Sequence, residues 1–345
     1  MIGSHGLIME RFDIIRSLAP LVGKGLEIGP SHSPLAAKKD GYDVEILDYL
    51  DADALRAKYA AAGADVSRIE AVDYVADGRP LADVIGAEGR YDWIIASHVI
   101  EHVPDLVLFL RECRKLLRPG GALVLAVPDK RCCFDIFRPI STVGQVLQAH
   151  LDCRTRPVPG ILFDDVAYAR QRGGNIGWHL KDDGALEAVR PLSFAAEVFR
   201  QACGSSDYVD MHCWVFVPSS FRLIVSTLAS LGQISLREAV FRHGHGEFFA
   251  VLTEDGTNCG ETFSALAEQA MLEEREATLG SPGASHSAQD QDQEALLARL
   301  RNAEVALAEA DATIKSLTGS LRALESATFW RATAPMRALV ERIRR

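Results

Sequence analysis

A glycine and an acidic residue stand at a spacing that suits the binding of a nucleoside. Gly29 ends a short apolar segment, residues 25–28, and Asp48 ends a second one, residues 43–47. A glycine turn lets the backbone approach a ligand closely, because glycine has no Cβ. An acid roughly 20 residues further along the chain accepts hydrogen bonds from the ribose hydroxyls. The spacing therefore predicts a nucleoside site, with a chance glycine turn as the alternative.

The residues after this glycine make a dinucleotide a poor ligand. Pro30 and Ser31 follow Gly29, so the turn lacks the paired glycines and free amides that hold a pyrophosphate. A ligand without a pyrophosphate is therefore favoured over NAD. S-adenosylmethionine is such a ligand, and the acidic Glu27 in the same segment suits its positive groups.

Three further segments extend this pattern. Asp77 and Gly78 follow the third apolar segment, where the Asp77 carboxylate is placed to accept a hydrogen bond from an adenine amino group. Ser97 and His98 follow the fourth apolar segment. Two turns come next, Glu-His-Val-Pro-Asp at residues 101–105 and Leu-Arg-Pro-Gly-Gly at residues 117–121.

In their order and sequence spacing, the motifs resemble those of the class I S-adenosylmethionine-dependent methyltransferase superfamily over about residues 22–253. The resemblance implies S-adenosyl-L-methionine as the cofactor and methyl transfer as the reaction. It also implies a cofactor site lined by Glu27, Gly29, Asp48, Asp77, Gly78, Ser97 and His98.

Methyl transfer to a hydroxyl needs a general base or a metal, because the hydroxyl proton must leave as the new bond forms. His98 is the candidate base, since its position faces the transferring methyl in this fold; the alternative is that it only shapes the cofactor pocket. Asp129, after the fifth apolar segment, is the second catalytic candidate, or else part of a solvated charged run. His102 is interpreted as structural. His243 and His245 are interpreted as surface residues, and no metal site is predicted.

Apolar segments alternate with helix-like stretches up to about residue 254, which predicts an α/β fold. The expected fold is a doubly wound, seven-stranded Rossmann-like sheet with a final antiparallel edge. The predicted strands are residues 25–28, 43–47, 69–75, 91–96, 122–127, 208–217 and 247–253. The clearest predicted helices are residues 106–117, with Asp105 as the N-cap, about 193–203, and about 218–232.

The composition changes along the chain and predicts its domains. Residues 1–254 are expected to form the methyltransferase domain, with a substrate-facing insertion at about residues 130–191. Residues 255–293 are predicted to be a helix and a flexible linker. Apolar residues recur at the a and d positions of about four heptads in residues 294–326, which predicts a coiled-coil helix. A basic amphipathic tail, residues 327–345, follows.

The C-terminal part also suggests partners. The heptads predict a parallel homo-oligomer, and the basic tail predicts contact with an anionic membrane surface; the alternatives are a helix packed on the domain and a solvated helix end. The coiled coil and residues 329–337 resemble methyltransferases of bacterial surface-polysaccharide synthesis. This narrower resemblance implies a sugar or glycan hydroxyl, free or lipid-linked, as the acceptor. The alternatives are a small-molecule methyltransferase and a non-catalytic coiled-coil scaffold in glycan assembly.

Charge and cysteine usage exclude other classes. The 345 residues carry a formal net charge of -10, which argues against a nucleic-acid partner. The seven cysteines are odd in number and scattered, and no window has the character of a signal peptide or a membrane span. A cytoplasmic location is therefore expected, with the tail at the inner face of the membrane.

Removal of residues 275–345 is expected to convert an oligomer into a monomer, because the predicted heptads lie in this part of the chain. Light scattering on the full chain and on the shortened chain measures the difference, and a monomeric full-length protein would contradict the expectation. Co-sedimentation with anionic liposomes tests the tail, and equal pelleting of both chains would show that it is not an anchor.

Overall fold

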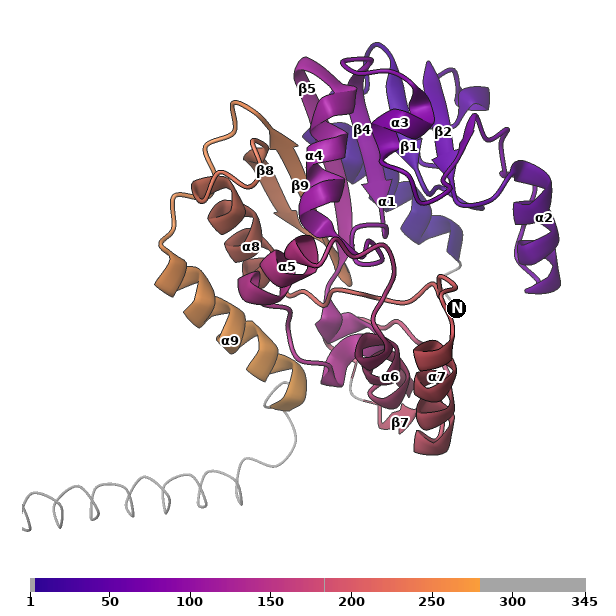
Figure 1. Ribbon diagram of the computed structural model, residues 1–345, viewed down its shortest axis with the longest axis vertical. Coiled ribbons are helices and arrows are strands. Elements are labelled where there is room, and N and C mark those ends of the chain that lie inside the picture. The colour runs from indigo at the N-terminus through magenta and orange to yellow at the C-terminus, as the bar shows by residue number, and fades with distance from the viewer. Residues whose placement is uncertain (1–3, 183, 280–345) are drawn as a thin grey trace, which may run out of the picture. The chain divides into compact units, whose positions relative to one another are not determined.

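The computed structural model describes residues 4–182 and 184–279, which form a seven-stranded mixed sheet with helices on both faces (Figure 1). The strands lie in the order β3-β2-β1-β4-β5-β9-β8. Neighbours pair in parallel except that β9 runs antiparallel to both β5 and β8. The strands are β1 Gly25–Ile28, β2 Val44–Asp48, β3 Tyr74–Val75, β4 Tyr91–Ser97, β5 Leu117–Pro128, β8 Arg237–His243 and β9 Glu247–Thr253.

The helices match the main predictions from sequence. The three predicted helices at 106–117, 193–203 and 218–232 are confirmed as α4, α7 and α8, each end within two residues. A separate two-stranded sheet pairs β6, Arg170–Arg172, with β7, Leu186–Ala188. The helices are α1 Ser4–Leu18, α2 Ala52–Ala61, α3 Leu81–Ile85, α4 Leu106–Leu116, α5 Val143–Leu151, α6 Pro159–Ala167, α7 Leu192–Gly204, α8 Pro218–Ser230 and α9 Phe263–Leu279.

Strand β4 contributes side chains to two hydrophobic cores, because successive residues of a strand point to opposite faces of the sheet. Ile94 and Ala96 belong to the core that α3, α4, α5 and α8 cover. Trp93 and Ile95 belong to the core on the other face, together with Ile15 of α1. The near-continuous apolar run of β4 is therefore explained by burial on both sides.

Helix α4 fixes the turn that precedes it. The Asp105 side chain accepts a hydrogen bond from the Leu108 amide at 2.9 Å and so caps the first turn of the helix. Leu106 and Leu110 are fully buried against the sheet. Because the cap and the buried face hold α4 in place, the segment between β4 and α4 is a short connection with little freedom.

The predicted sixth strand, residues 208–217, is wrong. Residues 213–217 are buried as expected, but their backbone groups bond to loops: the amides of Cys213 and Trp214 both donate to the Glu101 carbonyl, and the Lys130 amide donates to the Phe216 carbonyl. The strand is β8 instead. Its sequence mixes charged and apolar residues because it is an edge strand. In the strand order β9 lies between β5 and β8 rather than at the edge.

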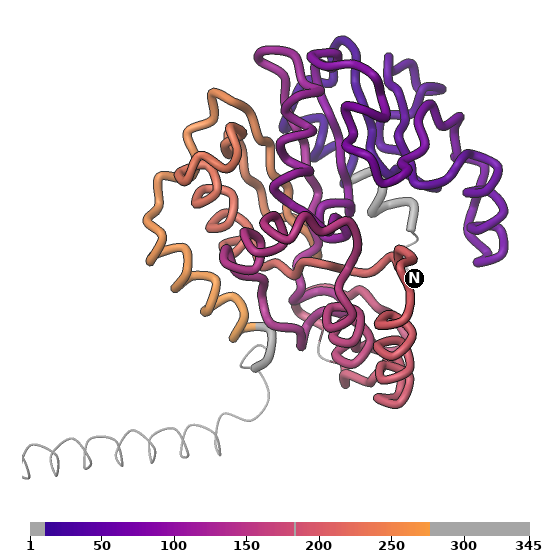
Figure 2. The backbone as a smooth tube through the Cα atoms, viewed as in Figure 1, coloured from indigo at the N-terminus to yellow at the C-terminus, as the bar shows by residue number. Residues whose placement is uncertain are grey.

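The segment after β5 first adds α5 to the core of the sheet and then extends beyond the end of the sheet. It contains α5, α6 and the two short strands β6 and β7. Helices α6 and α7 lie side by side (Figure 2), beyond the end of the sheet toward which the arrow of β4 points in Figure 1. Helices α6 and α7 therefore lie near the carboxyl ends of the parallel strands, where ligands bind in sheets of this kind.

The predicted coiled coil, residues 294–326, and the predicted basic tail, residues 327–345, lie outside the described residues. Within the part of the chain that the structure describes, no helix combines the length and the apolar content that crossing a bilayer requires.

We expect Gly25→Ala to lower the free energy of unfolding by about 1 to 3 kcal/mol. A Cβ at this position would lie 2.1 Å from the buried ring of Trp93, so the core would have to shift. Urea denaturation measures the change. Gly160→Ala in α6 is the matched control, since its Cβ meets nothing within 4 Å and alanine favours a helix. Equal stability of the two variants would contradict the packing.

Candidate functional site

The ends of three parallel strands lie in register at one edge of the sheet. Ile28 of β1 pairs with Leu47 of β2 and with Ala96 of β4. Gly29, the first residue after β1, therefore stands next to Asp48 and Ser97, the last residues of β2 and β4, at the carboxyl edge. The structure brings together these three residues, which the sequence predicts to bind a cofactor.

The glycine turn has the conformation that the motif requires. Gly29 has a φ of +66°, and a Cβ there would lie 2.9 Å from Cγ2 of Val99. Ser31 also has a positive φ, +51°. The Ser31 amide donates to Oδ2 of Asp48 at 2.9 Å, so the acid at the end of β2 holds the turn after β1. A side chain on Gly29 would disturb both the backbone and its contact with the next strand.

Asp48 is buried and is held by backbone amides. Its side chain accepts hydrogen bonds from the amides of Ser31 and Tyr49. Burial raises the pKa of Asp48, although both amide hydrogen bonds oppose the rise. Each carboxylate oxygen has a second lone pair, so Asp48 retains capacity to accept from a ligand hydroxyl.

Glu27 is the most strongly perturbed acid of the site. Only 1% of the residue is exposed, and its two carboxylate oxygens accept from the amides of Leu35 and Ala36 at 2.7 and 3.1 Å. Burial raises the pKa of Glu27 to about 7, although the two amides oppose the rise. Glu27 therefore anchors the loop that follows the glycine turn.

Asp77 and Gly78 lie at the margin of this edge. Val75, the last residue of β3, pairs with Asp48, and Asp77 follows two residues later. The Asp77 side chain is 46% exposed and forms an ion pair with Arg79 at 2.7 Å, which lowers the pKa of Asp77. Gly78 has a φ of +88°. The Asp77 carboxylate is thus available to solvent and already paired with a cation of its own turn.

His98, which follows β4, contacts side chains of α1 and β9. It has a φ of +53°, and its Nε2 lies 2.9 Å from Oε2 of Glu247 in β9 and 3.2 Å from Nη2 of Arg11 in α1. Burial alone raises the pKa of Glu247, but the contact with His98 and the charge of Arg11 outweigh burial and lower it. The imidazole is 38% exposed, so His98 combines an oriented ring with access to solvent.

Asp129 is engaged in the structure of its own turn. It is buried, and its carboxylate accepts from the Arg131 amide and from Nε and Nη2 of the Arg131 guanidinium, the shortest distance being 2.7 Å. Such a bidentate pair occupies both carboxylate oxygens. The structure therefore gives Asp129 the geometry of a turn-stabilising residue.

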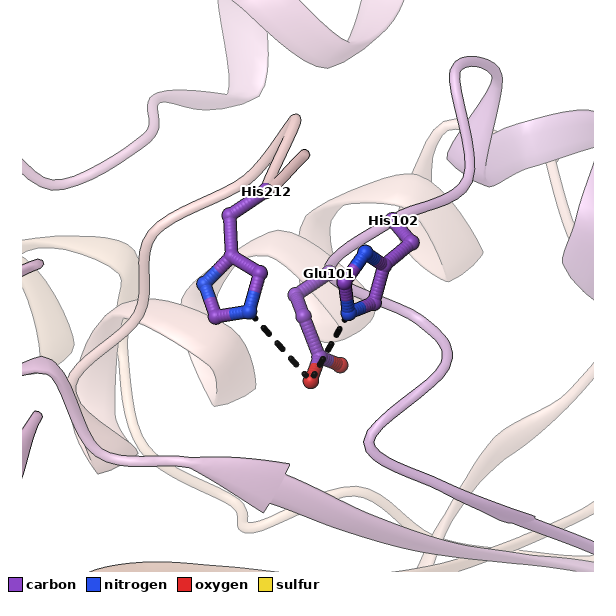
Figure 3. Close-up of side chains that lie close together, drawn as sticks. All are labelled: Glu101, His102 and His212. Carbon is purple, nitrogen blue, oxygen red and sulfur yellow. Dashed lines mark ion pairs between the residues drawn. The ribbon is translucent and has the colours of Figure 1, made fainter. Parts of the chain in front are cut away.

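A second group of titratable side chains lies directly after this edge. Glu101 and His102 belong to the turn between β4 and α4, and His212 comes from the segment before α8. Nε2 of His102 and Nε2 of His212 each lie 3.9 Å from the same oxygen, Oε1 of Glu101 (Figure 3). The two imidazole rings are 4.7 Å apart and nearly perpendicular.

A carboxylate also lies beside Nδ1 of each ring, as a hydrogen-bond partner of His212 and as an ion-pair neighbour without hydrogen-bond geometry of His102. Nδ1 of His102 lies 2.9 Å from Asp210, and Nδ1 of His212 lies 2.5 Å from Asp135. The Arg138 guanidinium in turn contacts Asp135 at 2.7 Å. The His212 ring is therefore fixed by a hydrogen bond, whereas the His102 ring has only the nearby Asp210 carboxylate; both Nε2 atoms face Glu101.

Family comparison agrees with this architecture. A family model described as methyltransferase domain matches residues 10–186, just over half of the 345 residues. The chain belongs to this family.

Similar proteins share parts of this methyltransferase domain. A ubiquinone biosynthesis O-methyltransferase of Chelativorans sp. is 32% identical over 93 residues, which are 25% of this chain and 36% of that protein. One from Ralstonia nicotianae is 33% identical over 122 residues, 34% of this chain and 48% of that protein. The chain thus spans between about a third and a half of these relatives. The structure of an S-adenosylmethionine dependent methyltransferase from Mesorhizobium loti is 15% identical, with 72% of this chain and 99% of that one covered and a TM-score of 0.37.

Sequence reasoning missed His212 as a site residue of the methyltransferase domain. It lies 110 positions after His102 and was assigned to a strand, so no spacing signal connects the two. The outer carboxylates were missed for the same reason. The available signal was a polar residue, His212, directly before the long apolar run 213–217.

Glu27→Gln is expected to remove a pH dependence from the stability of the domain. The pKa of Glu27 rises from 4.5 to about 7 on folding, so its contribution is complete below pH 4.5 and is lost as the pH rises through about 7. The loss amounts to roughly 3 kcal/mol. Urea unfolding of the cofactor-free protein from pH 4.5 to 7.5 measures it.

The control for this measurement is Glu187→Gln, which changes an exposed carboxyl group on β7. It should keep the wild-type slope of stability against pH. If Glu27→Gln keeps the same slope as well, burial does not raise the pKa of Glu27 on folding.

Proposed function

We propose that this protein transfers a methyl group from S-adenosylmethionine to a hydroxyl group, that of a sugar or glycan. The observation that carries the proposal is the Gly29 turn held by the buried Asp48 at the carboxyl edge of a methyltransferase domain. This edge is where ligands bind in open α/β sheets.

The residues of this edge have separate roles in the proposed reaction. Gly29 lets the backbone approach the nucleoside, and Asp48 accepts from the ribose hydroxyls through its remaining lone pairs. Glu27 holds the loop at residues 30–37 through two amide hydrogen bonds. Methyl transfer is a displacement at an activated sulfonium, so alignment and exclusion of water are the main demands on the protein.

A hydroxyl acceptor is supported by the polar layer built after β5. A cavity bounded by α5, α6 and residues 213–215 is lined by Arg138, Gln145, Gln148, Arg154, Asp164 and Trp214, among others. The guanidinium, amide and carboxylate groups of this cavity suit the hydroxyls of a sugar ring. His98, oriented by Glu247, is the general base of this proposal. The two curated relatives carry O-methyltransferase in their names, which is in line with a hydroxyl acceptor.

Asp48→Ala is expected to weaken the binding of S-adenosylhomocysteine by roughly 10- to 100-fold, the value of a hydrogen bond to a charged group. Isothermal titration calorimetry measures the affinity. Asp53→Ala is the matched control, because Asp53 is exposed on α2 and should leave the affinity unchanged. A wild-type protein that binds no S-adenosylhomocysteine would remove the methyltransferase proposal.

The acceptor is identified by transfer of a labelled methyl group to lipid-linked sugars, free sugars and phenolic hydroxyls, with mass spectrometry of the products. Methylated sugar is the expected product. Methylated phenol alone would favour a small-molecule methyltransferase. Cofactor binding without turnover on any acceptor would favour the scaffold alternative.

A further inference from the structure

We propose that Glu101, His102 and His212 form a binding site for a divalent transition-metal cation. The donor atoms of the three side chains lie within 4.8 Å of one another (Figure 3). Two imidazole nitrogens and one carboxylate oxygen are a ligand set that Zn²⁺, Mn²⁺ and Fe²⁺ accept in proteins.

The Glu101 carboxylate is the strongest reason to place a cation here. Glu101 has no exposed surface, and neither carboxylate oxygen has a hydrogen-bond partner among the residues that the structure describes. Burying an ionised carboxylate without a partner costs several kcal/mol. Its carbonyl, by contrast, accepts from the amides of Cys213 and Trp214, so the backbone of Glu101 is fixed while its side chain is left for a ligand.

The distances are too long for hydrogen bonds and suit a shared cation. Both Nε2 atoms lie 3.9 Å from Oε1 of Glu101, beyond the range of an N–H···O bond. Two ligands that each bind a metal at about 2.1 Å are separated by roughly 3 to 4 Å. A cation placed among the three side chains therefore reaches all of them with small movements.

The outer carboxylates prepare both histidines for this role. Metal-binding histidines commonly donate their other N–H to a carboxylate, which fixes the ring and leaves a lone pair on the inner nitrogen. Here Asp210 faces Nδ1 of His102, and Asp135 faces Nδ1 of His212. In the neutral tautomers that carry the proton on Nδ1, both Nε2 atoms present a lone pair toward Glu101, which is the arrangement that a cation requires. Asp135 favours this tautomer of His212 through its hydrogen bond to Nδ1.

A third histidine of the domain shows the contrast. His150 also has a carboxylate at Nδ1, that of Asp105 at 2.8 Å. Its Nε2, however, lies 3.1 Å from the Arg111 guanidinium, so a positive charge already occupies the position that a metal would take. A histidine with an outer carboxylate is thus not by itself a metal site, and the acceptors around Glu101 make the difference.

A cation at this site could activate the acceptor hydroxyl, and this role rests on the proposed function. Three protein ligands leave further coordination positions open, as in catalytic zinc sites. A cation lowers the pKa of a hydroxyl bound to it, which is the requirement that a hydroxyl acceptor adds to methyl transfer. The cavity proposed for the acceptor shares Arg138 and Cys213 with the surroundings of His212.

The test is calorimetric titration of the chelator-treated full chain with ZnCl₂ and MnCl₂, and with MgCl₂ for comparison. We expect about one Zn²⁺ or Mn²⁺ per chain, with Mg²⁺ much weaker. His212→Ala and Glu101→Gln should abolish this binding. Asp135→Asn should weaken it by about 10- to 100-fold, because Asp135 only orients His212. His150→Ala is the matched control and should bind as the wild type does.

Thermal unfolding completes the test, because it separates loss of the site from loss of the fold. Zn²⁺ should raise the melting temperature of the wild type and of His150→Ala, but not that of a folded Glu101→Gln protein. A wild type that binds no cation would overturn the proposal. Binding by His212→Ala and Glu101→Gln that equals binding by the wild type would overturn it too. Cation binding without S-adenosylhomocysteine binding would instead reject the proposed function and leave the metal site standing.

Discussion

The parallel register of β1, β2 and β4 is the constraint on which the site depends. Because Ile28 pairs with both Leu47 and Ala96, the three strands end at the same level. Their side chains are buried on both faces, so a polar group within a strand needs a partner, which Glu27 finds in the amides of Leu35 and Ala36. The glycine turn and Asp48 follow from this geometry, since Gly29 is the first residue after β1 and Asp48 is the last residue of β2.

Buried acids at this edge are stabilised in different ways, and the differences separate their roles. Glu27 is held by two backbone amides and has a pKa raised to about 7 by burial. Asp129 is neutralised by the Arg131 guanidinium. Glu101 has neither kind of partner within the described part of the chain; its nearest polar neighbours are the imidazoles of His98, His102 and His212 at 3.7 to 3.9 Å. The first two arrangements fix loops, whereas the third leaves a buried acceptor surrounded by imidazoles, which is the arrangement that the proposed cation site uses.

The sequence predicts the parts of the fold that local patterns encode. Four of the parallel strands, β1, β2, β4 and β5, were found because buried strands are apolar, and α4 because Asp105 is a recognisable cap. The third strand, predicted at residues 69–75, was mostly wrong, since β3 comprises only Tyr74–Val75 and neither residue is buried. The strand β8 was missed because an edge strand carries charged residues, and residues 213–217 were mistaken for a strand because burial alone makes a run apolar. Glu27, Asp48 and Gly29 were found from local spacing, but His212 reaches Glu101 only through tertiary structure, which no spacing rule describes.

The insertion after β5 and the cluster around Glu101 form one cooperative unit. Arg138 joins Asp135 to Asp165 of α6 in a buried network, and it also donates to the His212 carbonyl. A buried guanidinium between two carboxylates is costly to disturb, because removal of any partner leaves an unpaired charge. The orientation of His212 is therefore tied to the packing of α6. A substitution of Arg138 or Asp165 therefore acts on His212 as well as on α6, because the same buried network holds both.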